Sequence, residues 1–102
     1  MTEKRRPHHD LSAFKDAFCV RRVALATRKA LRDAAELNLD IRGIEEVVST
    51  MQRRHFVKSM TSYEDIRSWQ DAYHVPSEVG LLYVKFTDDQ ICEFRLLSFK
   101  EK

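Results

Sequence analysis

Five polar side chains in the second half of the sequence have the types and spacing needed for acid–base chemistry. They are Lys58, Gln70, Tyr83, Lys85 and Lys100. Cleavage of RNA without a metal needs a group that takes the 2′-hydroxyl proton, a group that protonates the leaving 5′-oxygen, and cations beside the phosphorane. Lysine and tyrosine can supply all three when burial and neighbouring charge shift their pKa values toward neutrality. Chemistry on a ribose phosphate is therefore one interpretation of this set.

The same residues also have a purely structural interpretation, in which long side chains lie on a sheet and extend their polar ends into water. Lys58 is the unusual member, because it alternates with the apolar residues Phe56 and Met60. A charge in that position is costly unless the strand face borders solvent or a ligand. Patterning alone favours the solvated face, so the chemical interpretation stays open.

Most other kinds of site are poorly supported by the sequence. The histidines are His8, His9, His55 and His74. They form no His-x-x-x-His pair and stand beside no acidic cluster, so we expect no metal site. The chain has two glycines, Gly43 and Gly80, and neither belongs to a phosphate-binding loop or a dinucleotide fingerprint. We therefore expect no cofactor.

Length and composition indicate an ordinary globular chain. With 102 residues, 43% of them hydrophobic and 33% charged, we expect a single domain over residues 1–102. No apolar run exceeds four residues, and the basic start is not followed by an apolar stretch. We expect neither a transmembrane helix nor a signal peptide, and a cytoplasmic location. We expect Cys19 and Cys92 to be small buried hydrophobes in a reducing compartment.

Positive charge is clustered although the net charge is only +2. The clusters are Lys4–Arg6, Arg21–Arg22, Arg28–Lys29 and Arg53–His55. Such clusters suit a polyanionic partner, although most charge runs are solvated faces. We take Arg53 and Arg54, together with Lys85, as candidate RNA-binding residues.

The first half of the chain has helical periodicity. Residues 1–9 resemble an arm or a short edge segment, and Asp10 is a cap for a helix through about Val20. Residues 21–26 are ambiguous and could form a short strand. The apolar stripe of the first helix is Leu11, Phe14 and Phe18.

Two further helices follow. Thr27 is a cap for the second, whose expected buried residues are Leu31, Ala34 and Ala35. Asn38 stands where a left-handed residue ends a helix, with Leu39 supplying the hydrophobic contact after it. Asp40 caps the third helix. The apolar face of that helix is Ile41, Ile44, Val47, Val48 and Met51.

After Arg54 the period changes from helical to two, which is typical of strands. The expected strands are 55–61, 69–75, 80–87 and 90–100. Residues 76–78 separate the second strand from the third, and Asp88–Asp89 is the expected polar link of the last hairpin. Leu82, Val84 and Phe86 should face one way, and Leu81, Tyr83 and Lys85 the other. Helices followed by an antiparallel meander predict an α+β domain.

Several motifs, spread over nearly the whole chain, resemble the MqsR family of toxin ribonucleases. The quoted residues are Phe56-x-Lys58-Ser59-Met60-Thr61-x-Tyr63-x-Asp65, Trp69-Gln70-Asp71-x-Tyr73, Gly80-x-x-Tyr83-x-Lys85 and Ser98-Phe99-Lys100-Glu101-Lys102. The opening Glu3-Lys4-Arg5-x-Pro7-His8 fits as well. The resemblance implies a RelE-like α+β fold, with N-terminal helices packed on a C-terminal antiparallel β-sheet.

The resemblance also implies a function. It implies the toxin of a toxin–antitoxin pair, a metal-independent, sequence-selective endoribonuclease that cuts single-stranded mRNA at GC-containing triplets. The family's active-site lysine, glutamine, tyrosine and C-terminal lysine match Lys58, Gln70, Tyr83 and Lys100. The implied partner is an MqsA-type antitoxin with a zinc-binding N-terminal domain and a helix-turn-helix C-terminal domain.

Individual roles and alternative functions stay open at this point. Tyr83 and either Lys58 or Lys100 would transfer protons, the other lysine would stabilise the phosphorane, and Gln70 would hold a phosphate or a base. Asp71 could be a supporting partner or a surface residue. One alternative is a non-catalytic toxin that inhibits a topoisomerase by protein contact, as some RelE relatives do. Another, a non-catalytic RNA binder, lacks a stacking platform, because we expect Trp69 in the core.

Overall fold

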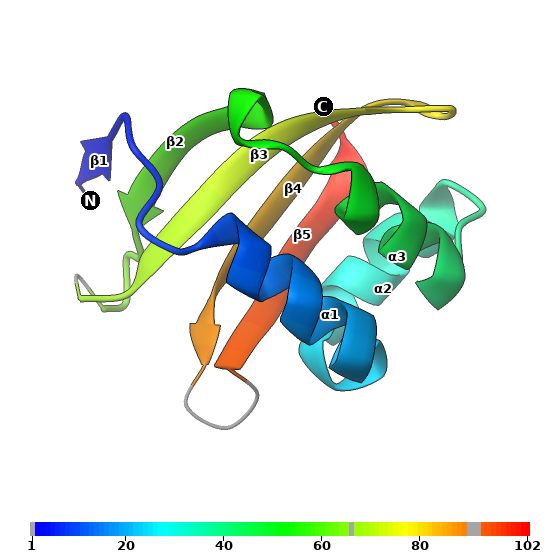
Figure 1. Cartoon of the computed structure of the whole chain (residues 1–102), viewed down its shortest axis with the longest axis horizontal. Coiled ribbons are helices and arrows are strands. Elements are labelled where there is room, and N and C mark those ends of the chain that lie inside the picture. Colours follow the sequence, from blue (N-terminus) through cyan, green and yellow to red (C-terminus); the bar gives the residue numbers. More distant parts are fainter. Residues whose placement is uncertain (1, 66, 90–92) are drawn as a thin grey trace.

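After a short first strand, the helices lie on one face of a sheet formed mainly by the second half of the chain (Figure 1). The structure is a computed structural model that describes residues 2–65, 67–89 and 93–102, with the backbone alone at 22–24 and 93. Its helices are α1 (Leu11–Leu25), α2 (Arg28–Glu36) and α3 (Ile41–Thr50), followed by the short 3₁₀ helix η1 (Arg53–His55). Its strands are β1 (Glu3–Lys4), β2 (Phe56–Thr61), β3 (Trp69–Ser77), β4 (Gly80–Asp89) and β5 (Glu93–Glu101). The predicted α+β class is confirmed.

The described strands form one sheet in the order β1-β2-β3-β4-β5, and every neighbouring pair is antiparallel. The N-terminal arm supplies β1 as an edge strand, as predicted. At the other edge, α2 packs against β5, where Thr27 N donates a hydrogen bond to Leu96 O. Within the described residues, no helix is long and apolar enough to cross a membrane.

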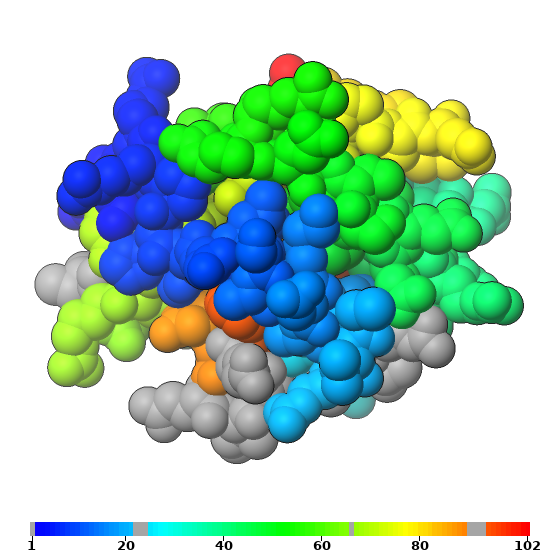
Figure 2. Space-filling view, in the orientation of Figure 1, coloured from blue at the N-terminus to red at the C-terminus, as the bar shows by residue number. Residues whose placement is uncertain are grey.

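The core lies between the helices and the sheet face that they cover. Leu82, Val84 and Phe86 are fully buried on this face, as the strand alternation predicts. Phe14 of α1 stacks on Phe86 with ring centroids 3.8 Å apart. Figure 2 shows the covered side, with the arm and α1 in blue and the region from α3 to η1 in green. None of the described helices lies on the opposite face of the sheet.

Local capping signals in the sequence correspond to real helix ends. The side chains of Asp10, Thr27 and Asp40 accept hydrogen bonds from backbone N–H groups in the first turns of α1, α2 and α3. Asn38 has φ 62°, and Leu39 N donates to Ala34 O in the pattern of a left-handed helix end. These four predictions are confirmed.

The helices differ from the expectations in two respects. α1 continues past Val20 to Leu25, with a kink at Arg21, so the ambiguous segment 21–26 is helical except for Ala26, which forms an isolated bridge with Leu96. The buried residues of α2 are Ala30 and Ala34, whereas Leu31 and Ala35 are exposed. The small side chains of Ala30 and Ala34 lie one turn apart, which allows α2 to approach β5 closely.

Two predictions about the strands also need correction. β3 continues through Pro76 and Ser77, because the hairpin turn is tight and Gly80 adopts φ 114° just after it. Asp88 and Asp89 lie within β4 and pair with β5, so they are not the link. The link, with the predicted strand start at 90–92, lies outside the described residues.

The cysteine prediction is wrong for Cys19, which is exposed. Cys19 follows the buried Phe18 on α1, and one helical step turns it away from the apolar stripe. Cys92 lies outside the described residues.

Candidate active site

The open face of the sheet, the face away from the helices, is organised in cross-strand rows. Residues that pair directly across antiparallel strands point to the same side of the sheet. One row is Lys58, Ala72, Lys85 and Ser98; the next is His74, Tyr83 and Lys100; the row on the other side is Met60, Gln70, Thr87 and Arg95. The open face therefore carries the four residues predicted as catalytic and Lys85.

Ala72 stands at the centre of this arrangement and is fully buried beneath its neighbours. Gln70 and His74 lie two residues away on β3, and Lys58 and Lys85 lie opposite on β2 and β4. Neighbouring strands are about 5 Å apart, and two residues along a strand span about 7 Å. The side chains of these four residues therefore leave the sheet at points about 5–7 Å from Ala72.

The open face is not one continuous hollow. The hollow between β4, β5 and α2 is lined by Lys29, Tyr83, Lys85, Ser98, Lys100, Glu101 and Lys102. A separate groove holds Lys58 together with Glu3, Lys4, Arg5 and Val57. The structure therefore brings Tyr83, Lys85 and Lys100 together and places Lys58 on the far side of β3.

Lys58 has a carboxylate partner on the N-terminal strand. Its Nζ lies 3.3 Å from Glu3 Oε2, with both side chains partly exposed. The pairing of β1 with β2 places Glu3 opposite Met60 on the open face. The Lys58 ammonium is therefore already paired with a carboxylate in this structure.

Lys85 lies among the other lysines of the site. Burial is the largest cause that lowers its pKa, followed by the positive charges of Lys29, Lys100 and Lys58. Lys85 therefore has the lowered pKa that is expected of a lysine among other lysines. A phosphate binding here would relieve the mutual repulsion of these cations.

Tyr83 does not meet the condition of a pKa shifted toward neutrality. Burial raises its pKa, although the charges of Lys58 and Lys29 act to lower it. Loss of solvent outweighs the nearby cations at this residue. Tyr83 therefore keeps its proton at neutral pH and can donate it.

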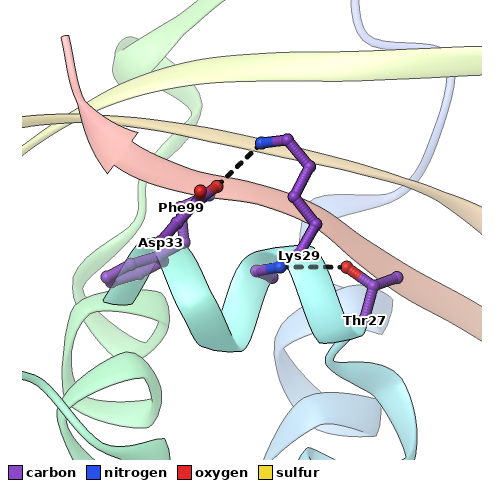
Figure 3. Close-up of polar contacts among 5 residues, drawn as sticks. Thr27, Lys29, Asp33 and Phe99 are labelled. Carbon is purple, nitrogen blue, oxygen red and sulfur yellow. Dashed lines mark hydrogen bonds and ion pairs between the residues drawn. The ribbon is translucent and has the colours of Figure 1, made fainter. Parts of the chain in front are cut away.

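Lys29 belongs to this site although the sequence indicated it only as part of a basic cluster. Its Nζ lies 2.9 Å from Asp33 Oδ2, and the same oxygen accepts a hydrogen bond from Phe99 N (Figure 3). Asp33 thus links α2 to β5 and directs Lys29 toward the hollow. Lys29 reaches the hollow because α2 packs against β5. No local sequence pattern predicts that packing.

His74 is a second residue that the sequence reasoning did not include. It pairs with Tyr83 across β3 and β4, and the two rings lie 5.9 Å apart at a tilt of 54°. Burial lowers its pKa, and the charge of Lys102 lowers it further. Alternation along the strand puts His74 on the same face of the sheet as Gln70, and this pattern could have identified it. The sequence reasoning considered the histidines only as metal ligands.

Arg53 and Arg54 lie in η1, away from the hollow. The Arg53 guanidinium stacks 5.0 Å from the centre of the Phe56 ring and lies in a hollow with Tyr73 on the helix side. Arg54 is exposed next to His55, whose pKa is lowered by burial and then by Arg54. RNA binding by the two arginines stays a prediction.

Asp71 is neither a surface residue nor part of the open face. It is fully buried and accepts hydrogen bonds from Ser59 Oγ at 2.6 Å, His9 N at 2.9 Å and His8 N at 3.0 Å. It fixes the N-terminal arm to β2 and β3. Trp69 is half-buried beneath this arm, stacked on His8, rather than in the core.

Comparison with known proteins gives two matches. Residues 6–101 match the family model described as "Motility quorum-sensing regulator, toxin of MqsA". The chain is also 41% identical over 100 residues to the mRNA interferase toxin MqsR of Escherichia coli (strain K12), covering 98% of this chain and 99% of that protein. The family match contains the entire open-face site.

Proposed function

We propose that this chain, which belongs to the MqsR family of toxins, is an endoribonuclease that cuts single-stranded mRNA and so inhibits translation. The observation that carries the proposal is the shared open face, on which the predicted residues surround Ala72. The residues of that face are Lys58, Gln70, Tyr83, Lys85 and Lys100.

The proposed reaction is transfer of the phosphoryl group to the neighbouring 2′-oxygen. The 2′-oxygen forms a bond to phosphorus, the bond to the 5′-oxygen breaks, and the products are a 2′,3′-cyclic phosphate and a 5′-hydroxyl. Lys58 and Lys85 contact the non-bridging oxygens from opposite sides, because they flank Ala72 on β2 and β4. Their charges stabilise the phosphorane more than the ground state.

Tyr83 is the proposed donor to the leaving 5′-oxygen. Its raised pKa keeps the phenol protonated until the transition state. Lys100 pairs with Tyr83 across the ladder, with Nζ 5.8 Å from the ring centre, where its charge can stabilise the phenolate. Gln70 donates a hydrogen bond to the phosphate or to an adjoining base.

Further contacts are proposed for the flanking nucleotides and for a protein partner. Lys29 and Lys102 line the hollow beside the reacting phosphate and suit the next backbone phosphates. Arg53 and Arg54 would contact RNA farther along. The family description, which names the toxin of MqsA, supports an MqsA-type antitoxin as the partner. The proposal extends to zinc-binding and helix-turn-helix domains in that antitoxin and to a cytoplasmic location.

The test is brief expression of the chain in growing cells, followed by mapping of the 5′ ends of transcripts. We expect growth arrest with new 5′-hydroxyl ends within mRNA, at GC-containing triplets. Tyr83→Phe should abolish both effects, whereas Tyr63→Phe, at a residue 85% exposed, should change neither. Growth arrest with uncut mRNA would instead support the topoisomerase-type alternative and refute the nuclease proposal.

A further inference from the structure

We propose that His74 is a catalytic residue of the open face, where its imidazole accepts the proton of the attacking 2′-hydroxyl. The inference rests on the proposed ribonuclease function and assigns the one role that the preceding residues leave unfilled. It comes from the position of His74 on the sheet, not from any of the motifs that matched the family.

The sheet places His74 beside both the proton donor and the phosphate cations. His74 pairs with Tyr83 on β4, with ring centroids 5.9 Å apart. It lies two residues from Ala72, which Lys58 and Lys85 flank. A phosphate held beside Ala72 by these lysines would therefore be close to both Tyr83 and His74.

The protonation states of the site favour an imidazole as the base. A base must lack a proton before the reaction, and an ammonium group cannot accept one. Tyr83 holds its proton, because burial raises the pKa of the phenol. His74 has the opposite property, since burial and Lys102 lower its pKa and leave the imidazole neutral at pH 7. The pKa of Lys85 is lowered as well, but from the much higher starting value of a lysine, 10.5.

The surroundings of His74 are mainly cationic. Tyr83 faces it from β4, and Lys100 and Lys102 lie on β5 and just after it. η1, which carries Arg53, Arg54 and His55, packs against β3, with Arg53 on the helix side beside Tyr73. Glu101, next to Lys100 on β5, is exposed and pairs opposite Leu82, outside the row of His74. Lys102 is the charge that lowers the pKa of His74 and disfavours the imidazolium, so a proton gained during the reaction is readily passed on.

In the proposed step, His74 gains one proton and Tyr83 loses one. One imidazole nitrogen of His74 takes the 2′-hydroxyl proton as the 2′-oxygen bonds to phosphorus. Tyr83 gives its phenolic proton to the 5′-oxygen as the phosphorus–oxygen bond breaks. The enzyme is left with an imidazolium beside a phenolate. Proton transfer from His74 to Tyr83, directly or through one water, restores the starting state without a co-reactant.

The first experiment compares His74→Gln with His55→Gln, a histidine in η1 whose ring nitrogen bonds Gln52 N. Rates are measured on a synthetic RNA from pH 5 to pH 9. For His74→Gln we expect kcat to fall by about 10²–10⁴, with KM little changed. The decline of wild-type activity below pH 6.5 should disappear in this variant and persist in His55→Gln. Binding of 2′-O-methyl RNA at wild-type affinity shows that the variant is folded; if it is not, His74→Asn takes its place.

A second substrate distinguishes the residue that acts as the acid from the residue that acts as the base. Replacing the 5′-bridging oxygen by sulfur gives a leaving group that needs no proton, so loss of the acid no longer slows cleavage. We expect Tyr83→Phe to approach wild-type rate on this substrate and His74→Gln to stay slow. An unchanged kcat or an unchanged acidic limb in His74→Gln, or its recovery on the sulfur substrate, overturns the assignment. These results leave the ribonuclease proposal intact, whereas failure of the wild type to cut either substrate refutes both.

Discussion

The Lys58 ammonium lies 3.3 Å from the Glu3 carboxylate, so the N-terminal strand supplies a counter-ion to a cation of the open face. The two residues are 55 positions apart in sequence and meet because β1 pairs with the edge of β2. The contact is partly exposed, and exposed pairs of this kind contribute little to stability. In the proposed function its main consequence concerns RNA binding, because the Glu3 carboxylate occupies the Lys58 ammonium that would contact the phosphate.

Glu3→Gln should therefore improve RNA binding. Removing the carboxylate frees Lys58 and lowers KM by about two- to fivefold, the range set by an exposed ion pair. kcat should change little, because Glu3 does not touch the reacting atoms. Glu46→Gln, on the helix side of the molecule, is the matched control and should leave KM unchanged. Equal KM values for the two variants would show that Glu3 does not restrain Lys58.

Lys29→Gln should alter both the salt and the pH dependence of RNA binding. Loss of one phosphate contact should reduce the slope of log affinity against log salt by about 0.7. Lys29 helps to lower the pKa of Lys85, so its removal raises that pKa, and Lys85 stays charged to higher pH. Binding of 2′-O-methyl RNA should weaken at pH 7 but persist to higher pH than in wild type. Arg42→Gln on α3 is the control, and an identical pH profile in Lys29→Gln would contradict the coupling.

Asp71→Asn should loosen the N-terminal arm. The buried carboxylate accepts bonds from Ser59 and from the backbone of His8 and His9, and hydrogen bonds to charged groups contribute about 1.5–3 kcal/mol each. We expect the free energy of unfolding in urea to fall by about 2–3 kcal/mol, with faster proteolysis of the arm. Asp65→Asn, at an exposed residue bonded to Arg67, should cost much less. Equal losses would mean that Asp71 does not anchor the arm.

Tyr73→Phe should act on stability at high pH. Burial raises the pKa of Tyr73 to about 12 from the ordinary value of 10.0 for a tyrosine. The folded state therefore disfavours the phenolate, and stability that is complete below pH 10 is lost as the pH rises through 12, by up to about 2–3 kcal/mol. Among the described residues, Tyr73 Oη has no hydrogen-bond partner, so Phe sacrifices no bond. The free energy of unfolding, measured at pH 9 and pH 11, should be lower at pH 11 in the wild type and in the control Tyr63→Phe. It should not show this loss in Tyr73→Phe. The same loss in all three proteins would contradict the account.

The parts of the fold that could be predicted from the sequence rest on local signals. Asp40 caps α3 because its side chain reaches a backbone N–H three residues later. Asn38 ends α2 because it tolerates a positive φ. Leu82, Val84 and Phe86 face the core because strand side chains alternate. Each of these signals needs only neighbouring residues.

The parts that could not be predicted depend on contacts between distant segments. Lys29 reaches the open face only because Asp33 bonds the backbone of Phe99, 66 residues later. Asp71 is buried because His8 and His9 supply its partners from more than 60 residues earlier. The upward pKa shift of Tyr83 depends on how far the completed sheet buries it. Residue types and spacing do not contain this information.

The most direct test of the central claim is cleavage of a synthetic RNA by the purified chain in EDTA, with a second RNA that carries 2′-deoxyribose at the cut position. The account predicts that EDTA leaves cleavage intact, that the new end is a 2′,3′-cyclic phosphate, and that the deoxy substrate is not cut. Lys58→Ala and Tyr83→Phe should each lower the rate by about 10²–10³. Uncut RNA, cleavage of the deoxy substrate, or unchanged rates in both variants would contradict an active site on the open face of the sheet.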